Sequence, residues 1–227
     1  MGAPPEAEIH SSGLSISPWI DDEPLIEAVR ADGQARWTLR PYESTAIVLG
    51  RGSKPEVELH LDAVLADGVP VFRRRGGGCA VLLDPGNLIV SVVQPLPGIG
   101  GSKAAFARLS AWLIEALAAA GAPGVEQRGI SDLVLGNRKV GGSAIYREQG
   151  LLYYSSTLLI DPNIAGMERW LAHPPREPEY RAARRHGEFL GALPNAFDHD
   201  TLRDILSAGA WTNPHREPTG MSSGRKS

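Results

Sequence analysis

Short apolar runs alternate along this chain with polar, glycine- and proline-rich stretches. Three of the runs, at residues 44–50, 87–93 and 151–160, are rich in β-branched or aromatic side chains. Such runs, closed by glycine or proline, are typical of β-strands. The run at 87–93 has so few polar positions that we expect it to be buried on both faces.

One longer segment, residues 102–120, has the spacing of an α-helix. Ser102 is a candidate N-cap, and Gly121 is a stop signal for the helix. Four large apolar side chains recur at helical intervals and are predicted to face the core: Phe106, Leu109, Leu113 and Leu117.

Residues 132–144 predict a β-hairpin, because Gly136-Asn137 separates two strand-like pieces and suits a tight turn. Strand and helix signals interleave without strict alternation. This favours an α+β (mixed α/β) fold, with a mixed β-sheet flanked by helices. We expect one domain over residues 14–207, between flexible ends at 1–13 and 208–227.

Composition excludes several classes of protein. The 227 residues include 42% hydrophobic and 22% charged residues, with a net charge of −3, so the chain is neither disordered nor membrane-embedded in character. The slight excess of acidic residues argues against bulk nucleic-acid binding. The single cysteine excludes an internal disulfide, which suits a cytoplasmic location.

The densest chemical signal is the run Arg73-Arg74-Arg75-Gly76-Gly77-Gly78-Cys79. Consecutive glycines can turn backbone N–H groups toward one point, and the arginines add positive charge, so the run indicates an anion-binding loop. The alternative is a flexible, solvated basic turn. The spacing matches neither the dinucleotide-binding fingerprint nor the P-loop.

A second signal is Lys139, which follows the predicted hairpin turn and precedes Gly141 and Gly142. A lysine ammonium is a compact charge that can stabilise a phosphoryl or carbonyl oxygen. The alternative is a solvated hairpin lysine.

Several spaced motifs together resemble the lipoate-protein ligase A family, whose fold is similar to the catalytic domain of biotin-protein ligases. The resemblance covers about residues 36 to 193 and includes Gly50-Arg51, the segment 71–81, the segment 84–88, Ser131-Asp132-Leu133, the segment 138–144 and Thr157-Leu158-Leu159. A later stretch from Glu179 to Phe189 is similar to the segment that closes that domain.

The resemblance implies an ATP-dependent, two-step acylation. Lipoate would form lipoyl-AMP, and a lysine of a lipoyl-domain or glycine-cleavage-H-like carrier protein would then take the acyl group. Lys139 would be catalytic and Asp132 would orient it or help to hold Mg²⁺. The substrate- or nucleotide-binding positions would be the segment 73–79 with Asp84, Asn87, Asp132, Lys139, Gly142, Ser143 and Ala144.

For Asp132, Asn87 and Ser143, the alternative is a purely structural role in a turn or loop. We interpret Cys79 as a small buried side chain rather than as a nucleophile. A basic cluster, Arg181, Arg184, Arg185 and His186, is the candidate docking patch for an acidic carrier, with a solvated helix face as the alternative.

The chain departs from the family pattern at two places. Many relatives have His-Asp where this chain has Leu83-Asp84, and His-Gly-Thr where it has Ser155-Ser156-Thr157. The small accessory C-terminal domain of larger ligases is not visible in the sequence, so a separate accessory subunit is one expectation and a short ligase that works alone is the other.

Two other functions stay open. An octanoyltransferase of the same fold would need a cysteine nucleophile, and Cys79 stands in the glycine loop rather than on a later loop. A non-catalytic module that holds lipoate, an adenylate or a carrier would not need Lys139 and the complete loop. A biotin ligase is disfavoured because its arginine- and glycine-rich loop pattern is missing.

Overall fold

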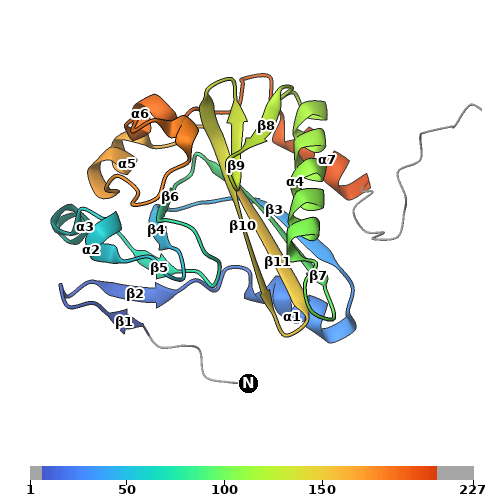
Figure 1. The fold of residues 1–227 in the computed structure, drawn as a ribbon, viewed down its shortest axis with the longest axis horizontal. Helices are drawn as coiled ribbons and strands as arrows, with labels where there is room; N and C mark the ends of the chain where they lie inside the picture. Colours follow the sequence, from blue (N-terminus) through green and yellow to red (C-terminus); the bar gives the residue numbers. More distant parts are fainter. Residues whose placement is uncertain (1–6, 209–227) are drawn as a thin grey trace, which may run out of the picture.

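The computed structural model describes residues 7–208, which form two β-sheets with helices packed around them (Figure 1). The larger sheet has six antiparallel strands in the order β3-β7-β11-β10-β9-β8. They are β3 (Arg36–Pro41), β7 (Asn87–Pro95), β8 (Val125–Arg128), β9 (Asp132–Leu135), β10 (Arg138–Glu148) and β11 (Leu151–Leu159).

The smaller sheet has five strands in the order β1-β2-β5-β4-β6: β1 (Glu8–Ile9), β2 (Ser15–Pro18), β4 (Ala46–Leu49), β5 (Val71–Arg73) and β6 (Val81–Leu83). Strands β2, β5 and β4 are parallel, and the two edge strands are antiparallel. The mixed α/β class is therefore confirmed, but the expectation of one sheet is wrong. The period of apolar positions identifies strands, whereas the choice of hydrogen-bonding partners depends on contacts distant in sequence.

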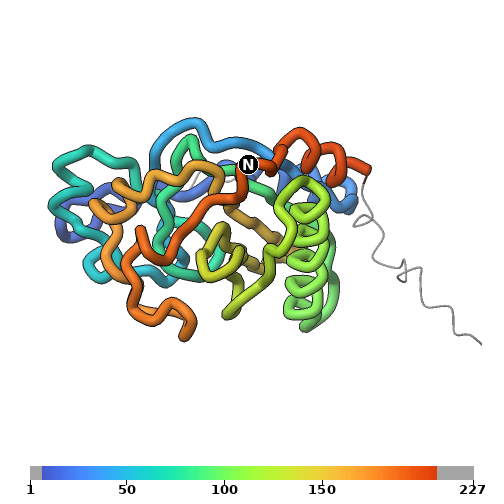
Figure 2. The backbone as a smooth tube through the Cα atoms, turned by 90° about the horizontal axis from the view of Figure 1, so that it is seen from above, coloured from blue at the N-terminus to red at the C-terminus, as the bar shows by residue number. Residues whose placement is uncertain are grey.

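Helix α4 (Ser102–Ala119) and α7 (His199–Ala208) lie side by side and cover one face of the larger sheet (Figure 2). Leu109, Leu113 and Leu117 are buried, as the spacing predicts, while Phe106 is only partly buried. The expected cap is wrong by one residue, because Gly101 precedes the helix with a left-handed φ of 78° and Ser102 is already helical.

The opposite face of the larger sheet packs on α1 (Glu23–Asp32) and on the smaller sheet. Strand β7 is buried on both faces from Asn87 to Gln94, which confirms the sequence prediction. Its side chains alternate between the two sides: Val90 and Val92 enter the core beneath α4, whereas Ile89 packs toward the smaller sheet.

A second core lies between the smaller sheet and the helices at the end of the molecule remote from α4 (Figure 1). These helices are α2 (Pro55–Glu58), α3 (Leu61–Asp67), α5 (Ile164–Trp170) and α6 (His186–Phe189), with the 3₁₀ turn η1 (Glu179–Arg181). Phe189 and Leu190 enter this core, so the segment 176–191, called here the closing segment, is packed against the smaller sheet.

The ends of the chain differ from expectation in one respect. Strand β1 lies within the stretch 1–13 expected to be flexible, and it pairs with β2. Residues 1–6 of that stretch and 209–227 of the expected C-terminal tail lie outside the described residues, and Ala208 is the last residue of α7. In the described part of the chain, no helix is both long and apolar enough to cross a membrane.

Candidate active site

Lys139 lies near the start of β10, just after the predicted Gly136-Asn137 turn, and the β9–β10 hairpin is confirmed. Its Nζ is 2.7 Å from Oδ1 of Asp132. The register of the hairpin shifts between Lys139 and Gly141, so the strand has a bulge beside the lysine. A Cβ atom on Gly142 would lie 3.2 Å from Nζ, so the absence of a side chain at Gly142 leaves room for the lysine to fold back over the strand.

Asp132 is buried, and both of its oxygens are engaged. Oδ1 pairs with Lys139, and Oδ2 accepts a 2.8 Å hydrogen bond from the hydroxyl of Tyr180 in the closing segment. Burial raises the pKa of Tyr180, followed in effect by the bond to Asp132, so this hydroxyl stays a donor at neutral pH. Mg²⁺ needs free oxygen ligands. One oxygen of Asp132 pairs with Lys139 and the other accepts from Tyr180, so Mg²⁺ at this carboxylate stays a prediction and we derive no step through it.

The arginines of the glycine loop are tied to the protein. Arg73 donates to the carbonyl oxygens of Gly50 and Ser53 and pairs with Glu8. Its charge therefore holds β5 to the turn after β4, and a bound anion would compete with these contacts.

Arg74 donates to the carbonyl oxygens of Val48, Gly77 and Cys79. The guanidinium thus gathers the loop around itself, and burial lowers its pKa from the ordinary value. Arg74 shapes the loop from within.

Arg75 bridges two other elements. It lies 2.5 Å from a carboxylate oxygen of Glu23 in α1 and 2.5 Å from one of Glu148 at the end of β10. The three arginines together serve largely as internal connections, which sequence reasoning did not anticipate. Among the described residues, the N–H groups of Gly77 and Gly78 donate to no partner, so the backbone is the part of the loop that could still bind an anion.

The glycine loop and Lys139 lie over the same face of β10. A Cβ on Gly76 would be 3.6 Å from Cβ of Ala144, and Lys139 folds over Gly142. Gly142 and Ala144 are two positions apart on one strand, so they share a face and are separated by about 7 Å. The structure therefore brings the two sequence signals together between the two sheets.

Ser143 points the other way. Its hydroxyl is 3.0 Å from the hydroxyl of Tyr154 and 3.2 Å from that of Ser156, both fully buried in the core beneath α4. The alternation along β10 puts Ser143 on the face opposite to Gly142 and Ala144. The structure thus favours the structural role for Ser143.

Asp84 and Asn87 organise the turn before β7. Oδ1 of Asp84 accepts hydrogen bonds from the N–H of Gly86 and the amide of Asn87, and Oδ2 accepts one from the N–H of Asn163. Asp84 is therefore engaged in joining this turn to the start of α5. Asn87 is buried, and its Oδ1 has no partner among the described residues.

Cys79 is half-buried, and its thiol pKa is raised by burial and then by the nearby Glu58. A raised pKa reduces the thiolate fraction, which disfavours a nucleophilic role. Glu58, missed by sequence reasoning, accepts hydrogen bonds from the N–H of Ala80 and the hydroxyl of Ser53 and so supports the end of the glycine loop. Neither its place in a short acidic helix nor its neighbours signal that role.

A cleft of about 380 Å³ lies farther along β10, where the side chains of Arg75, Tyr146 and Glu148 meet Arg51 and Ile16. It adjoins the glycine loop, while Lys139 lies outside its lining. The cleft therefore extends the face of β10 on which Gly142 and Ala144 lie.

The expected docking patch is not an exposed basic surface. Arg181 and His186 are buried, and the guanidinium of Arg184 donates hydrogen bonds to the carbonyl oxygens of Asn137 and Tyr180. The docking interpretation of this cluster is therefore wrong: only Arg185 is exposed, because the segment turns its basic side chains inward to bind backbone.

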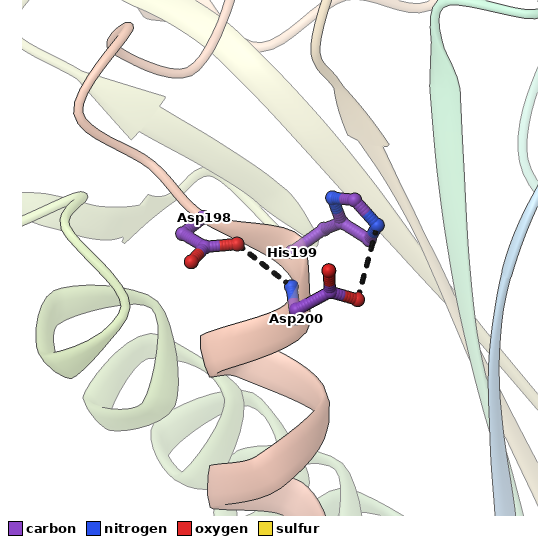
Figure 3. A group of neighbouring side chains, drawn as sticks. All are labelled: Asp198, His199 and Asp200. Atoms are coloured by element: carbon purple, nitrogen blue, oxygen red, sulfur yellow. Dashed lines mark hydrogen bonds and ion pairs between the residues drawn. The ribbon is translucent and has the colours of Figure 1, made fainter.

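A cluster of metal-ligand type, Asp198, His199 and Asp200, lies at the start of α7, remote in sequence from the site residues (Figure 3). Asp198 accepts hydrogen bonds from the N–H of Asp200 and the hydroxyl of Thr201. These are contacts of a helix cap, and all three cluster residues are exposed. We assign no metal to them.

Comparison with known proteins identifies the family. Residues 21–206 match the model of the lipoyl protein ligase A/B catalytic domain. A lipoate–protein ligase of Streptococcus pyogenes is 33% identical over 130 residues, which is 57% of this chain and 38% of that protein. Lipoate-protein ligase A of Psychrobacter cryohalolentis is 26% identical over 196 residues, 84% of this chain and 56% of that protein.

Solved structures agree on the fold. The bi-partite lipoate protein ligase of Thermoplasma acidophilum superposes with a TM-score of 0.66 at 19% identity, covering 85% of this chain and 79% of that one. A lipoate-protein ligase A structure with bound ATP gives a TM-score of 0.58 at 21% identity, covering 79% and 74%. The chain spans between about two fifths and just over half of the two curated relatives. By its sequence and its fold, this chain belongs to the lipoyl protein ligase A/B catalytic-domain family.

Proposed function

We propose that this protein is a lipoate-protein ligase, which activates lipoate with ATP to lipoyl-AMP and transfers the lipoyl group to a lysine of a carrier protein. The observation that carries the proposal is the position of Lys139 and the glycine loop over one face of β10. An acyl-adenylate presents a carbonyl and a phosphate close together, and this face offers an ammonium beside free loop N–H groups.

In the first half-reaction the lipoate carboxylate attacks the α-phosphate of ATP and pyrophosphate leaves. The ammonium of Lys139 would stabilise the negative charge that develops on the phosphate oxygens. The N–H groups of Gly77 and Gly78 would hold the same anion from the side of the smaller sheet.

In the second half-reaction the carrier amine attacks the acyl carbonyl and AMP leaves. Lys139 would then stabilise the developing charge on the carbonyl oxygen, so one ammonium serves both steps. Asp132 keeps the lysine at this position in the absence of substrate.

The carrier is proposed to be a lipoyl-type domain. The T. acidophilum ligase was described with an E2 lipoyl domain and is bi-partite. By similarity to that bi-partite ligase, a separate accessory subunit is part of the proposal.

The test is to incubate the protein with ATP and lipoate and to measure pyrophosphate and acyl-adenylate before any carrier is added. Addition of a lipoyl domain should then release AMP and acylate one lysine. Acylation from an octanoyl thioester without ATP would instead support the octanoyltransferase, and binding without turnover would support a non-catalytic module. The raised thiol pKa of Cys79 argues against the thioester route.

A further inference from the structure

The closing segment reaches Lys139 in two places. On the backbone, the N–H of Gly191 donates to the carbonyl of Lys139, and Leu190 forms a parallel bridge with Lys139. On the side chain, Tyr180 donates to the carboxylate of Asp132, which pairs with the ammonium of Lys139. The segment thus contacts the backbone of Lys139 directly and reaches its ammonium through Asp132.

Tyr180 is itself firmly placed. Its ring packs against Phe189 with centroids 5.3 Å apart, and Phe189 is buried in the core beside the smaller sheet. Arg128 lies over the ring at 5.9 Å, and Arg184 binds the carbonyl of Tyr180 while also binding that of Asn137 at the hairpin turn. The hydroxyl therefore has little freedom to leave the carboxylate.

The carboxylate can hold Lys139 only while its own orientation is fixed. An aspartate side chain rotates about two torsions, and a bond to one oxygen alone leaves it free to swing with its partner. The bond from Tyr180 to Oδ2 fixes the plane of the group and directs Oδ1 at Nζ.

We propose that Tyr180 is a positioning residue for the reaction, which orients Asp132 and through it holds the ammonium of Lys139 over Gly142. This role rests on the proposed function of Lys139. It couples the closing segment to the reaction centre, so that the segment positions Lys139 as well as packing on the smaller sheet.

The first experiment compares Tyr180→Phe, which keeps the ring on Phe189 and removes the hydroxyl, with Tyr154→Phe. The control also loses a buried hydroxyl bond, but on the opposite face of the sheet. We expect Tyr180→Phe to lower kcat about tenfold in both half-reactions, with the KM for ATP changed less than about twofold, because the ammonium is misplaced in the transition state rather than lost from binding. Tyr154→Phe should keep the wild-type kcat.

The second experiment does not depend on activity. Lysines are labelled with a water-soluble acylating reagent, and the rate at Lys139 is read by mass spectrometry against the exposed Lys54 and Lys103. An amine held in a short ion pair reacts slowly, so loosening the pair in Tyr180→Phe should speed labelling of Lys139 about threefold or more. The rates at Lys54 and Lys103 should not change.

The two experiments separate the two proposals. If the wild-type protein releases no pyrophosphate, the proposed function fails, and the labelling rate alone decides the role of Tyr180. Wild-type kcat together with wild-type labelling in Tyr180→Phe would overturn the positioning role. Equal losses in Tyr180→Phe and Tyr154→Phe would also overturn it, because a general effect on the fold would then explain both. If Tyr180→Phe melts well below the wild type, the labelling rate of Lys139 is measured at a low temperature where the variant is folded, and it decides the positioning role in the same way.

Discussion

At the scale of single residues, the position of Lys139 depends both on the missing side chain of one neighbour and on the negative charge of another. Gly142 leaves the space that the lysine occupies, and Asp132 supplies the opposite charge. In the proposed function, the paired carboxylate holds the ammonium over the strand, where it would meet the negative charge that develops in the transition state.

Replacement of Lys139 tests this directly. Lys139→Ala should lower the rates of both half-reactions by about 10²- to 10³-fold, since one charged donor to a developing oxyanion is removed. Lys139→Arg should restore little, because a planar guanidinium cannot take the place of the compact ammonium that lies 2.7 Å from Asp132 and directly over Gly142. Pyrophosphate release and carrier acylation from prepared lipoyl-AMP measure the two steps, and wild-type rates for the Ala variant in both assays would remove Lys139 from the mechanism.

The residues of the site differ in how far the sequence could reveal them. Lys139, Asp132 and the glycine loop stand in a recognisable order, and the structure brings them together. Ser143 lies one residue from Gly142 yet faces the core, because strand alternation turns neighbours to opposite faces and the bulge at Lys139 sets the phase. Tyr180 is far from the loop in sequence, and only the folded closing segment brings it to Asp132.

At the scale of elements, the glycine loop depends on a close approach of two backbones. A Cβ on Gly50, at the end of β4, would lie 1.9 Å from the carbonyl oxygen of Gly78. Only a residue without a side chain permits this contact, which brings the loop close to the smaller sheet.

Gly50→Ala is therefore expected to displace the loop. Overpacking of this kind lowers the free energy of unfolding by about 1–3 kcal/mol. Because the loop is displaced, the variant should also lose most of its pyrophosphate release. Gly52→Ala is the matched control, because a Cβ there meets nothing within 4 Å. Denaturant melts and pyrophosphate release measure both effects, and a Gly50→Ala protein as stable and active as Gly52→Ala would contradict this account of the loop.

Helix α4 supports the sheet that presents Lys139, and its buried face was predictable because the pattern is local. Leu113→Ala should reduce the free energy of unfolding by about 2–5 kcal/mol, the usual cost of a cavity at a fully buried leucine. Leu65→Ala on α3, where the side chain is exposed, should cost far less. An unchanged melting temperature for Leu113→Ala would mean that α4 does not support the core.

Local sequence patterns predict single strands, helices and hairpins, but not which strands pair to form a sheet. Strand β7 and the β9–β10 hairpin follow from residue types and turn residues that lie within a few positions of each other. The division into two sheets does not, because β5 pairs in parallel with β2 and β4, which lie far away in sequence. The inward turn of Arg184 likewise depends on the carbonyl of Asn137, which the β9–β10 turn delivers, whereas Arg181 donates to the carbonyl of Arg184 in its own segment.

At the scale of the whole molecule, the site joins two cores. Lys139 comes from the larger sheet, the glycine loop follows β5 of the smaller sheet, and the closing segment packs against the smaller sheet while it contacts Lys139. Anything that loosens the closing segment should therefore affect both the stability and the geometry of the site.

His186 in α6, within the closing segment, should make the stability of the protein sensitive to acid. Burial, and then the charge of Arg181, lower its pKa to about 4, from 6.5 in an unfolded chain. Between these values the unfolded chain binds more protons than the folded one, so stability rises with pH across this window and falls as the solution is acidified from pH 6.5 toward 4. The full linkage of such a shift is about 3 kcal/mol, and since the ring keeps some contact with solvent we expect about 2 kcal/mol.

The measurement is the free energy of unfolding at several values between pH 4 and 7, for the wild type and His186→Gln. The His186→Gln variant should be less sensitive to pH in this window, because the group that takes up the proton on unfolding has been removed. Hydrogen-exchange protection factors, which correct for the slower intrinsic exchange in acid, should fall at residues 186–190 toward pH 4 in the wild type before they fall in the core beneath α4, because the proton enters at the closing segment. Parallel slopes for the two proteins would show that the acid response arises elsewhere in the molecule.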